Sequence, residues 1–151
     1  MHHLPIIKQL LSATTSTDTR TVCFYKRYKS MFITYHASIY DLPFNSNSHV
    51  ISFIENDKSD MIQYGNIILF LSQENEDFVF IQKYVSCKKQ MSNYVELPTE
   101  LHDPIDTYFP LVSLSDNFTI IPVTNIRHKC VLVHLSNSFC ISEIRIDYEH
   151  D

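Results

Sequence analysis

Short runs of β-branched and aromatic residues, separated by polar turn-forming segments, make up most of this chain of 151 residues. Such residues suit a pleated, half-buried surface, so the pattern favours strands over helices. Ile67–Leu71 is a continuous apolar run, which predicts a strand covered on both faces. The predicted strands are Thr21–Tyr28, Met31–His36, His49–Glu55, Ile62–Ser72, Phe78–Val85, Lys129–Leu135 and Ser138–Ile146.

Two hairpins follow from the turn chemistry between these strands. The polar segment Gln73–Asp77 turns the chain, so that Phe78–Val85 returns beside Ile62–Ser72. A second hairpin is predicted around Ser136-Asn137, which joins the last two strands.

The stretch Phe109–Val133 predicts a further strand-turn-strand unit. A two-residue turn at Asp116-Asn117 would pair Leu114 with Thr119. An odd-numbered loop gathers the apolar side chains more cleanly on one face, so we expect the odd loop. Pro122 cannot donate a ladder hydrogen bond and should lie on an edge or at a strand end.

Roughly eight or nine short strands with turns between them are typical of an all-β small barrel or partly open sandwich. Leu4–Ser12 predicts a short N-terminal helix with an early proline. We therefore expect a short helix and polar linker over residues 1–20 and a single β domain over residues 21–151. Ser86–Thr107, interrupted by Pro98 and Pro104, is predicted to be a long surface loop.

Composition excludes one class of function and disfavours another. Gly65 is the only glycine, and phosphate-binding loops need several, so a P-loop or dinucleotide-binding domain is excluded. The formal net charge is −5, from 12 Lys and Arg against 17 Asp and Glu. That balance disfavours a protein that binds nucleic acid mainly through its phosphates.

A basic cluster nevertheless lies at Lys26, Arg27 and Lys29, with Tyr25 and Tyr28 as neighbours. Clusters of this size are usually solvated. Aromatic residues beside cations are also how β modules stack and hold single-stranded nucleic acid. A nucleic-acid-binding module using this cluster is therefore an alternative function.

Several tyrosines lie near predicted strand ends or loops. Aromatic walls of this kind can hold a cationic ligand, and the competing interpretation is that they pack a β core. The candidate binding residues are Tyr25, Lys26, Arg27, Tyr28, Lys29, Tyr64 and Tyr84.

Cysteine usage and the absence of apolar spans bear on location. The four cysteines have wide, irregular spacings with no CxxC pair. The chain start lacks the features of a signal peptide, and no apolar run approaches the ~20 residues that span a bilayer. We expect an intracellular protein, nuclear or cytoplasmic, with reduced thiols and no membrane contact.

Metal and catalytic motifs are weak. His128, Cys130 and His134 share one side of a predicted strand, and Cys140 lies in the next strand, but the short paired spacing of zinc sites is missing. We therefore predict no metal and no cofactor.

Acid–base chemistry has one local candidate. Asp103 and Asp106 lie near His102 in the proline-interrupted segment, where solvated carboxylates are the ordinary expectation. No nucleophile, base and orienting group occur together in a known motif. The chain is predicted not to be an enzyme, with a small enzyme using a non-local site as a further alternative.

The segment Ile120–Cys130 resembles the end of a bromo-adjacent homology (BAH) domain. In that family an apolar strand and a proline are followed by an Ile and then a Lys-Cys pair. Ser138–Tyr148 is similar to the family's closing strand, and His49–Leu71 to its early hairpins. The BAH-like β domain of some transposase-derived proteins is similar in the same places. The matching motif residues are Pro122, Ile126, Lys129 and Cys130.

The resemblance implies a non-enzymatic protein-interaction module, associated with chromatin or a transposon, whose partner is another protein. Two residues depart from the family's pattern. His128 replaces a glycine before the Lys-Cys pair, and Lys83 stands where members that read methyl-lysine have a Trp. These departures argue against methyl-lysine reading.

Overall fold

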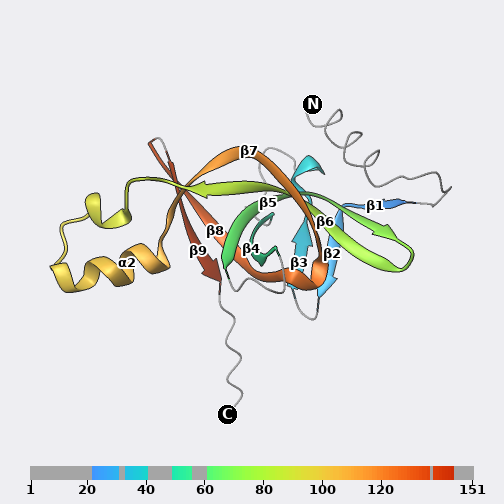
Figure 1. Cartoon of the computed structure of the whole chain (residues 1–151), viewed down its shortest axis with the longest axis horizontal. Helices are drawn as coiled ribbons and strands as arrows, with labels where there is room; N and C mark the ends of the chain where they lie inside the picture. The colour runs from blue at the N-terminus through green and yellow to red at the C-terminus, as the bar shows by residue number, and fades with distance from the viewer. Residues whose placement is uncertain (1–21, 31–32, 41–48, 56–60, 137, 145–151) are drawn as a thin grey trace, which may run out of the picture.

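Nine β-strands dominate the described part of the protein (Figure 1). The structure is a computed structural model that describes residues 22–30, 33–40, 49–55, 61–136 and 138–144. The strands are β1 (Cys23–Tyr25), β2 (Arg27–Ser30), β3 (Ile33–His36), β4 (Val50–Ile54), β5 (Ile62–Gln73), β6 (Glu76–Ser86), β7 (Leu111–Pro122), β8 (Ile126–Leu135) and β9 (Ser138–Ile144). The predicted mostly β fold is confirmed.

Seven strands form one antiparallel sheet in the order β1-β5-β4-β8-β9-β7-β6, and β2 and β3 form a separate hairpin. The strand β6 pairs with β5 as well as with β7. The paired strands β5, β4, β8, β9, β7 and β6 therefore form a closed circuit. The β7–β9 link consists only of Leu111 with Cys140 and Val112 with Phe139. The structure therefore confirms a mostly β architecture with one large antiparallel sheet. The predicted barrel is not confirmed. The predicted helix Leu4–Ser12 lies outside the described residues.

The hairpin of β5 and β6 confirms the first turn prediction. Gln73 pairs with Glu76, so Glu74 and Asn75 form a two-residue turn. Their φ angles are 55° and 68°, as a type I′ turn requires at both central positions. Asn tolerates this left-handed region well, and Glu adopts it much less often.

The predicted hairpin at Asp116-Asn117 is wrong, because β7 is one continuous strand. The β7 residues Ser115–Asn117 oppose Lys83 alone, which makes an irregularity in the ladder rather than a turn. The Ser115 hydroxyl donates to the Lys83 carbonyl at 2.8 Å and accepts from the Asn117 N–H at 3.2 Å. These turn-forming residues therefore form a bulge within the strand. Neither the two-residue turn nor the odd-numbered loop is present.

The predicted position of Pro122 at a strand end is confirmed, whereas β8 begins at Ile126 and not at the predicted Lys129. Pro122 is the last residue of β7, and the 3-10 turn η4 (Val123–Asn125) leads into β8. Leu135 pairs with Ser138, which confirms the predicted last hairpin. Asn137 of that predicted turn lies outside the described residues.

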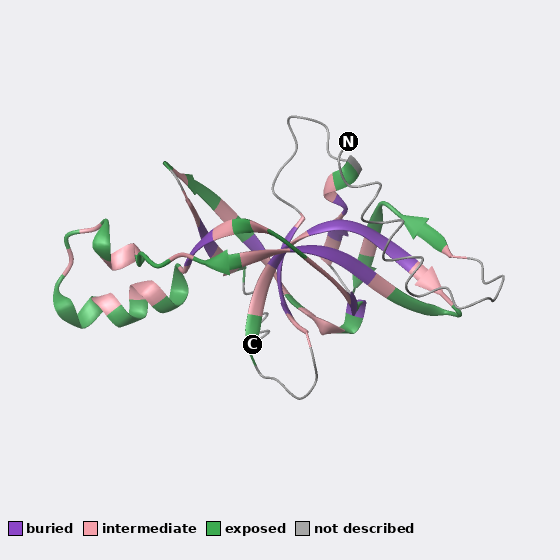
Figure 2. Cartoon of the chain, turned by 45° about the horizontal axis from the view of Figure 1, so that its top comes forward, coloured by how far each residue is buried: buried purple, intermediate pink, exposed green. Residues whose placement is uncertain are grey.

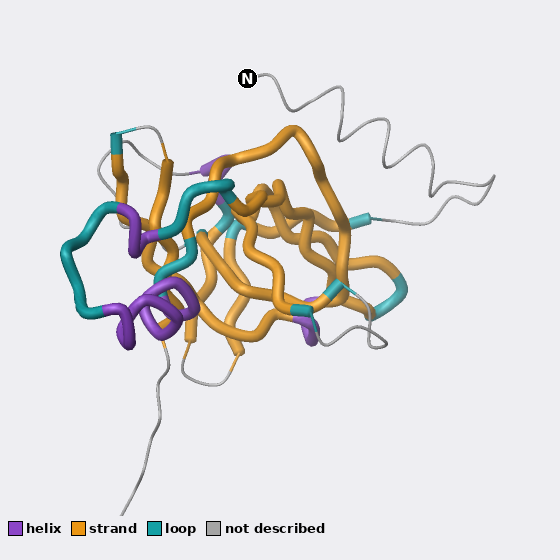
Figure 3. The backbone as a smooth tube through the Cα atoms, turned by 60° about the vertical axis from the view of Figure 1, so that its left-hand side comes forward, coloured by secondary structure: helices purple, strands orange, loops and turns teal. Residues whose placement is uncertain are grey.

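The segment between β6 and β7 was predicted to be a loop and instead contains the 3-10 turns η2 (Met91–Asn93) and η3 (Thr99–Leu101) and the helix α2 (His102–Tyr108). Pro104 lies in the first turn of α2, where no intrahelical partner for its missing N–H exists. Ser92 donates its N–H at 2.8 Å and its hydroxyl at 2.7 Å to Asp106, which ties η2 to α2. This helical segment lies at one end of the molecule (Figures 1 and 3).

Buried residues follow the central parts of the long strands (Figure 2). The β2–β3 hairpin covers the first core cluster, to which it contributes Tyr35 from β3. Ile67 and Phe70 belong to this cluster, whereas Ile68 and Leu71 belong to a cluster on the other face of β5. The predicted burial of Ile67–Leu71 on both faces is therefore confirmed. A second core cluster, with Tyr64 and Tyr84 packed against it, consists of Val50, Val112, Cys130 and Ile141.

Gly65 has a packing role where β5 pairs with both β4 and β6. A Cβ atom at this position would overlap Ile81 Cγ2 and lie 3.1 Å from both the Gln82 carbonyl oxygen and Phe53 Cε1. The single glycine therefore allows three strands to approach closely without a side chain between them.

Candidate binding site

A recess of about 200 Å³ lies where β1 and β2 meet the β5–β6 hairpin. It brings together most of the sequence-predicted basic and aromatic cluster. We call it the basic recess, and its lining residues are Tyr25, Arg27, Tyr28, Lys29, Phe70, Leu71, Asp77 and Val123.

Strand pairing places the recess residues. Tyr25 is the last residue of β1 and pairs with Phe70 of β5. The chain then changes direction at Lys26, whose carbonyl accepts from the Ala37 N–H at 2.9 Å. After this bend the chain enters β2, which belongs to the separate β2–β3 hairpin. Tyr25 and Tyr28 are therefore close in sequence but line the recess from two different strands.

The two tyrosines of the recess have different environments. The Tyr28 ring centroid lies 5.8 Å from that of Phe70 and 6.5 Å from that of Tyr35, so the first core cluster holds this ring in place. Tyr25 is 45% exposed and its neighbour Phe24 is 47% exposed. The recess thus has one fixed aromatic wall and one accessible one.

Charges of both signs lie in and around the recess. Arg27 and Lys29 are exposed, and within the described residues no ion pair joins either of them to a carboxylate. Asp77 is the acidic lining residue, and Glu74 and Glu76 lie in or beside the adjacent β5–β6 turn. Lys26 is exposed beside the recess but does not line it.

The candidate binding residues Tyr64 and Tyr84 lie away from the basic recess. Both pack against the second core cluster. The Tyr84 ring meets Phe139 edge-to-face with centroids 6.0 Å apart, and burial raises the Tyr84 pKa to about 12. Tyr64 lines another hollow of about 500 Å³, together with Tyr108 and Glu143.

Four lining residues were missed by sequence reasoning: Phe70, Leu71, Asp77 and Val123. Phe70 and Leu71 belong to an apolar run that predicts core packing, and Asp77 belongs to a predicted turn. Phe70 and Leu71 reach the recess through their pairing with β1, which is distant in sequence. Asp77 comes from the β5–β6 hairpin and Val123 from η4.

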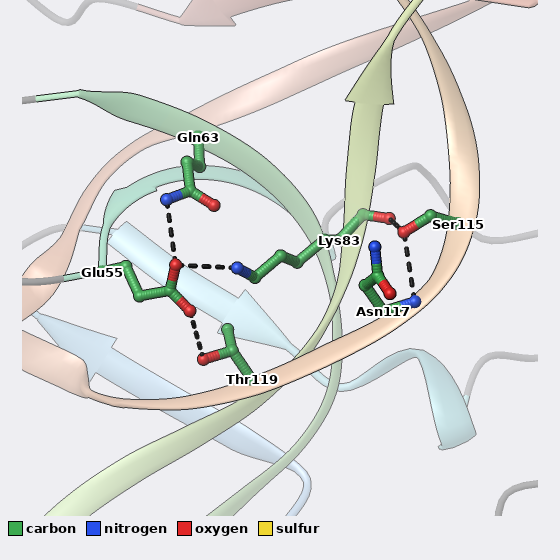
Figure 4. Close-up of polar contacts among 6 residues, drawn as sticks. All are labelled: Glu55, Gln63, Lys83, Ser115, Asn117 and Thr119. Atoms are coloured by element: carbon green, nitrogen blue, oxygen red, sulfur yellow. Dashed lines mark hydrogen bonds and ion pairs between the residues drawn. The ribbon is translucent and has the colours of Figure 1, made fainter.

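Glu55 lies at the centre of a separate polar network (Figure 4). Its carboxylate accepts from Lys83 Nζ at 2.7 Å, from Gln63 Nε2 at 3.0 Å and from Thr119 Oγ1 at 2.9 Å. The hydrogen bond from Lys83, supported by those from Gln63 and Thr119, lowers the Glu55 pKa. The network links the end of β4 to β5, β6 and β7, and it explains why Lys83 occupies its position.

The zinc candidates do not converge. Cys130 pairs with Glu143 and Cys140 with Val133, so the two thiols point to opposite faces of the sheet. Among the described residues, no group of three or more His, Cys, Asp or Glu side chains is arranged to hold a metal ion.

The candidate acid–base and nucleophilic groups are also engaged in packing. Burial, with a contribution from nearby Glu143, raises the Cys130 pKa to about 12, whereas a nucleophilic cysteine needs a lowered pKa. His102 Nε2 lies 3.1 Å from the Leu97 carbonyl. Burial acts to raise the Asp106 pKa, but the two hydrogen bonds from Ser92, together with smaller contributions from His102 and the Met91 backbone, lower it overall.

Among the described residues, none of the helices has the length and apolar character required to cross a bilayer. Comparison with protein-family models, curated proteins and solved structures finds no match to this chain.

Proposed function

We propose that this chain is a non-enzymatic protein-interaction module that binds another protein through the basic recess. The observation that carries the proposal is the convergence of Tyr25, Arg27, Tyr28 and Lys29 around one recess with an apolar floor. Tyrosine and arginine are enriched among the residues that dominate binding energy at protein interfaces. An exposed tyrosine beside a partly buried one supplies contact area with little loss of side-chain freedom.

The BAH-like character of the module, and its association with chromatin or a transposon, are part of the proposal through the resemblance at Ile120–Cys130. The local geometry is compatible with it, since Pro122 ends β7 and the Lys-Cys pair lies in β8. A module of this kind should bind core-histone tail peptides or nucleosomes in a pull-down with the purified full chain. Failure of both ligands would remove the chromatin part of the proposal and leave the interaction surface to be tested separately.

Selection of peptides from a random display library tests the interaction surface. The wild-type chain should enrich peptides whose affinity falls about tenfold or more with Tyr25→Ala, because an anchor residue at an interface contributes on that scale. Tyr94→Ala is the matched control, since Tyr94 is 54% exposed in the helical segment between β6 and β7. Enriched peptides that bind both variants equally well would contradict the proposed surface.

Binding of nucleic acid is the second candidate because the same recess combines cations and tyrosines. The acidic neighbours Glu74, Glu76 and Asp77 oppose a phosphate backbone, as does the net charge of −5. Titration with single-stranded DNA and RNA oligonucleotides at low salt distinguishes the two functions. Tight binding that weakens steeply with salt would favour nucleic acid over a protein partner.

A further inference from the structure

We infer that the partner segment bound by the basic recess is an acidic peptide that carries one apolar or aromatic anchor side chain. This inference rests on the proposed function and specifies the chemistry of the ligand. It follows from the size of the recess, from its floor and from the charges at its rim.

The size of the recess suits one side chain. Its volume is about 200 Å³, and an apolar cavity of roughly 150 Å³ is known to accept a benzene-sized group. A folded element such as a helix could not enter it, whereas one ring or branched aliphatic group could. The recess therefore selects an anchor residue.

The floor of the recess makes that anchor apolar. Phe70, Leu71 and Val123 come from β5 and η4, and the Tyr28 ring stands beside Phe70. An apolar group placed there removes both its own surface and that of the floor from water. The free energy gained is about 25 cal/mol per Å² of apolar surface. A charged group would lose its hydration without a buried partner.

The rim makes the residues that flank the anchor acidic. Arg27 and Lys29 lie one on each side of Tyr28 in sequence and are exposed. Within the described residues neither has a carboxylate partner, and a guanidinium matches a carboxylate through two parallel hydrogen bonds. An acidic flank on the β2 side would complete these pairs.

The remaining charges favour a peptide over a nucleic acid. Asp77 also lines the recess, and Glu76 precedes it at the start of β6. A uniformly charged phosphate backbone crossing the recess would meet both signs of charge. A peptide can place its acidic residues beside Arg27 and Lys29 alone, so the mixed rim selects a ligand whose charge varies along its length.

The test uses the full chain and three labelled peptides in fluorescence anisotropy. The first is Asp-Asp-Glu-Phe-Glu-Asp-Asp, the second replaces its Phe by Ser, and the third replaces its acidic residues by Lys. We expect the first to bind about tenfold more tightly than either of the others. The double variant Arg27→Glu/Lys29→Glu should reverse the preference between the first and third peptides.

The matched control is Lys88→Glu/Lys89→Glu, which changes the net charge equally at exposed positions outside the recess. It should leave the affinity for the first peptide within about twofold, since screened charges far from the ligand act weakly. If the Glu variant of the recess loses its circular dichroism signal, Arg27→Gln/Lys29→Gln replaces it, with the loss of the acidic peptide as its expected result.

Equal binding of the acidic and basic peptides, or an unchanged affinity in the recess variant, would overturn the inference. Displacement of the acidic peptide by a single-stranded oligonucleotide of higher affinity would overturn it as well. Peptides from the display selection that depend on Tyr25 but carry no acidic residues would refute the acidic ligand and leave the proposed function standing. Selected peptides that ignore Tyr25 would remove the proposed function itself.

Discussion

Two pairs of tyrosines that look alike in the sequence lie in different places in the structure. Tyr25 and Tyr28 line the basic recess, whereas Tyr64 and Tyr84 pack against the second core cluster. All of them follow or precede polar residues in strand-like runs. What separates them is how their strands are paired.

Among the described residues, β1 pairs only with β5, and β2 pairs only with β3. The strands β5 and β6 have partners on both edges. A side chain on a doubly paired strand is covered by its neighbours' side chains, and one on a short edge strand is not. The comparison teaches that aromatic residues become candidates for binding when their strand lies at an edge.

Gly65→Ala tests how tightly the doubly paired region is packed and should have one of the two largest effects. The new methyl group would overlap Ile81 Cγ2, which lies on the neighbouring strand β6. We expect a loss of about 3 kcal/mol in the free energy of unfolding, at the upper end for overpacking. Urea denaturation measures it.

A double-mutant cycle with Ile81→Ala supplies the control for this prediction. Ile81→Ala alone should cost about 2–5 kcal/mol, as for other buried truncations. The combined variant should lose less than the sum of the two, because the smaller residue makes room for the new methyl group. Additive losses would show that the overlap is not the cause.

Tyr84→Ala and Tyr25→Ala compare the two pairs of tyrosines directly. Tyr84→Ala removes a ring packed against Phe139 and should lower the free energy of unfolding by about 3 kcal/mol. Tyr25→Ala removes a ring that is 45% exposed, so the loss should stay below about 0.5 kcal/mol. Urea denaturation of both variants at one pH decides it, and equal losses would contradict the comparison.

The sequence predicts the β5–β6 hairpin because the polar segment Gln73–Asp77 separates two apolar, strand-like runs. It fails at Asp116-Asn117 for a physical reason. The same residue types that make turns also fill bulges, and only the partner strand decides between the two. Here Lys83 supplies the carbonyl that accepts the Ser115 hydroxyl, and the strand continues.

The candidate site could be predicted only in part, for a similar reason. The sequence groups Tyr25 with Arg27, Tyr28 and Lys29 because they are consecutive or nearly so. It cannot supply Val123, which lies almost a hundred positions later and reaches the recess at the end of β7. Long-range pairing of strands depends on the whole sheet, which local patterns do not determine.

Alkaline pH offers a further way to separate the two regions. Burial raises the Tyr84 pKa to about 12 from its ordinary value of 10.0, so folding favours its neutral form. Below pH 10 this contribution is fully present. As the pH rises from 10 toward 12, the unfolded chain loses the proton first and the free energy of unfolding falls.

The expected loss from this residue is about 2 kcal/mol, allowing for partial exposure of the ring. Tyr84→Phe should remove that part of the pH dependence, so the variant should become more stable relative to the wild type above pH 10. Urea denaturation at pH 9, 10 and 11 on both proteins isolates the effect from other groups. Parallel curves would show that the Tyr84 hydroxyl is hydrated in the folded protein.

The smallest predicted effect compares a paired cation with an unpaired one. Lys83→Met removes the ion pair with Glu55 and keeps most of the side-chain stem, so it should cost about 1 kcal/mol of the free energy of unfolding. Lys29→Met is the matched control and should cost about nothing, because Lys29 has no carboxylate partner among the described residues. Urea denaturation at pH 7 measures both.

The pH dependence of the Lys83 effect identifies its cause. The bond from Lys83 lowers the Glu55 pKa, so its stabilisation is present above the unfolded carboxyl pKa and is lost as the pH falls through the lowered folded value. The difference between wild type and Lys83→Met should therefore shrink on acidification below pH 4.5, the ordinary pKa of a Glu carboxyl group. A difference that stayed constant would assign the effect to packing of the Lys83 stem. Lys29 and Lys83 would then differ only in burial. The presence or absence of a carboxylate partner would not explain their different contributions to stability.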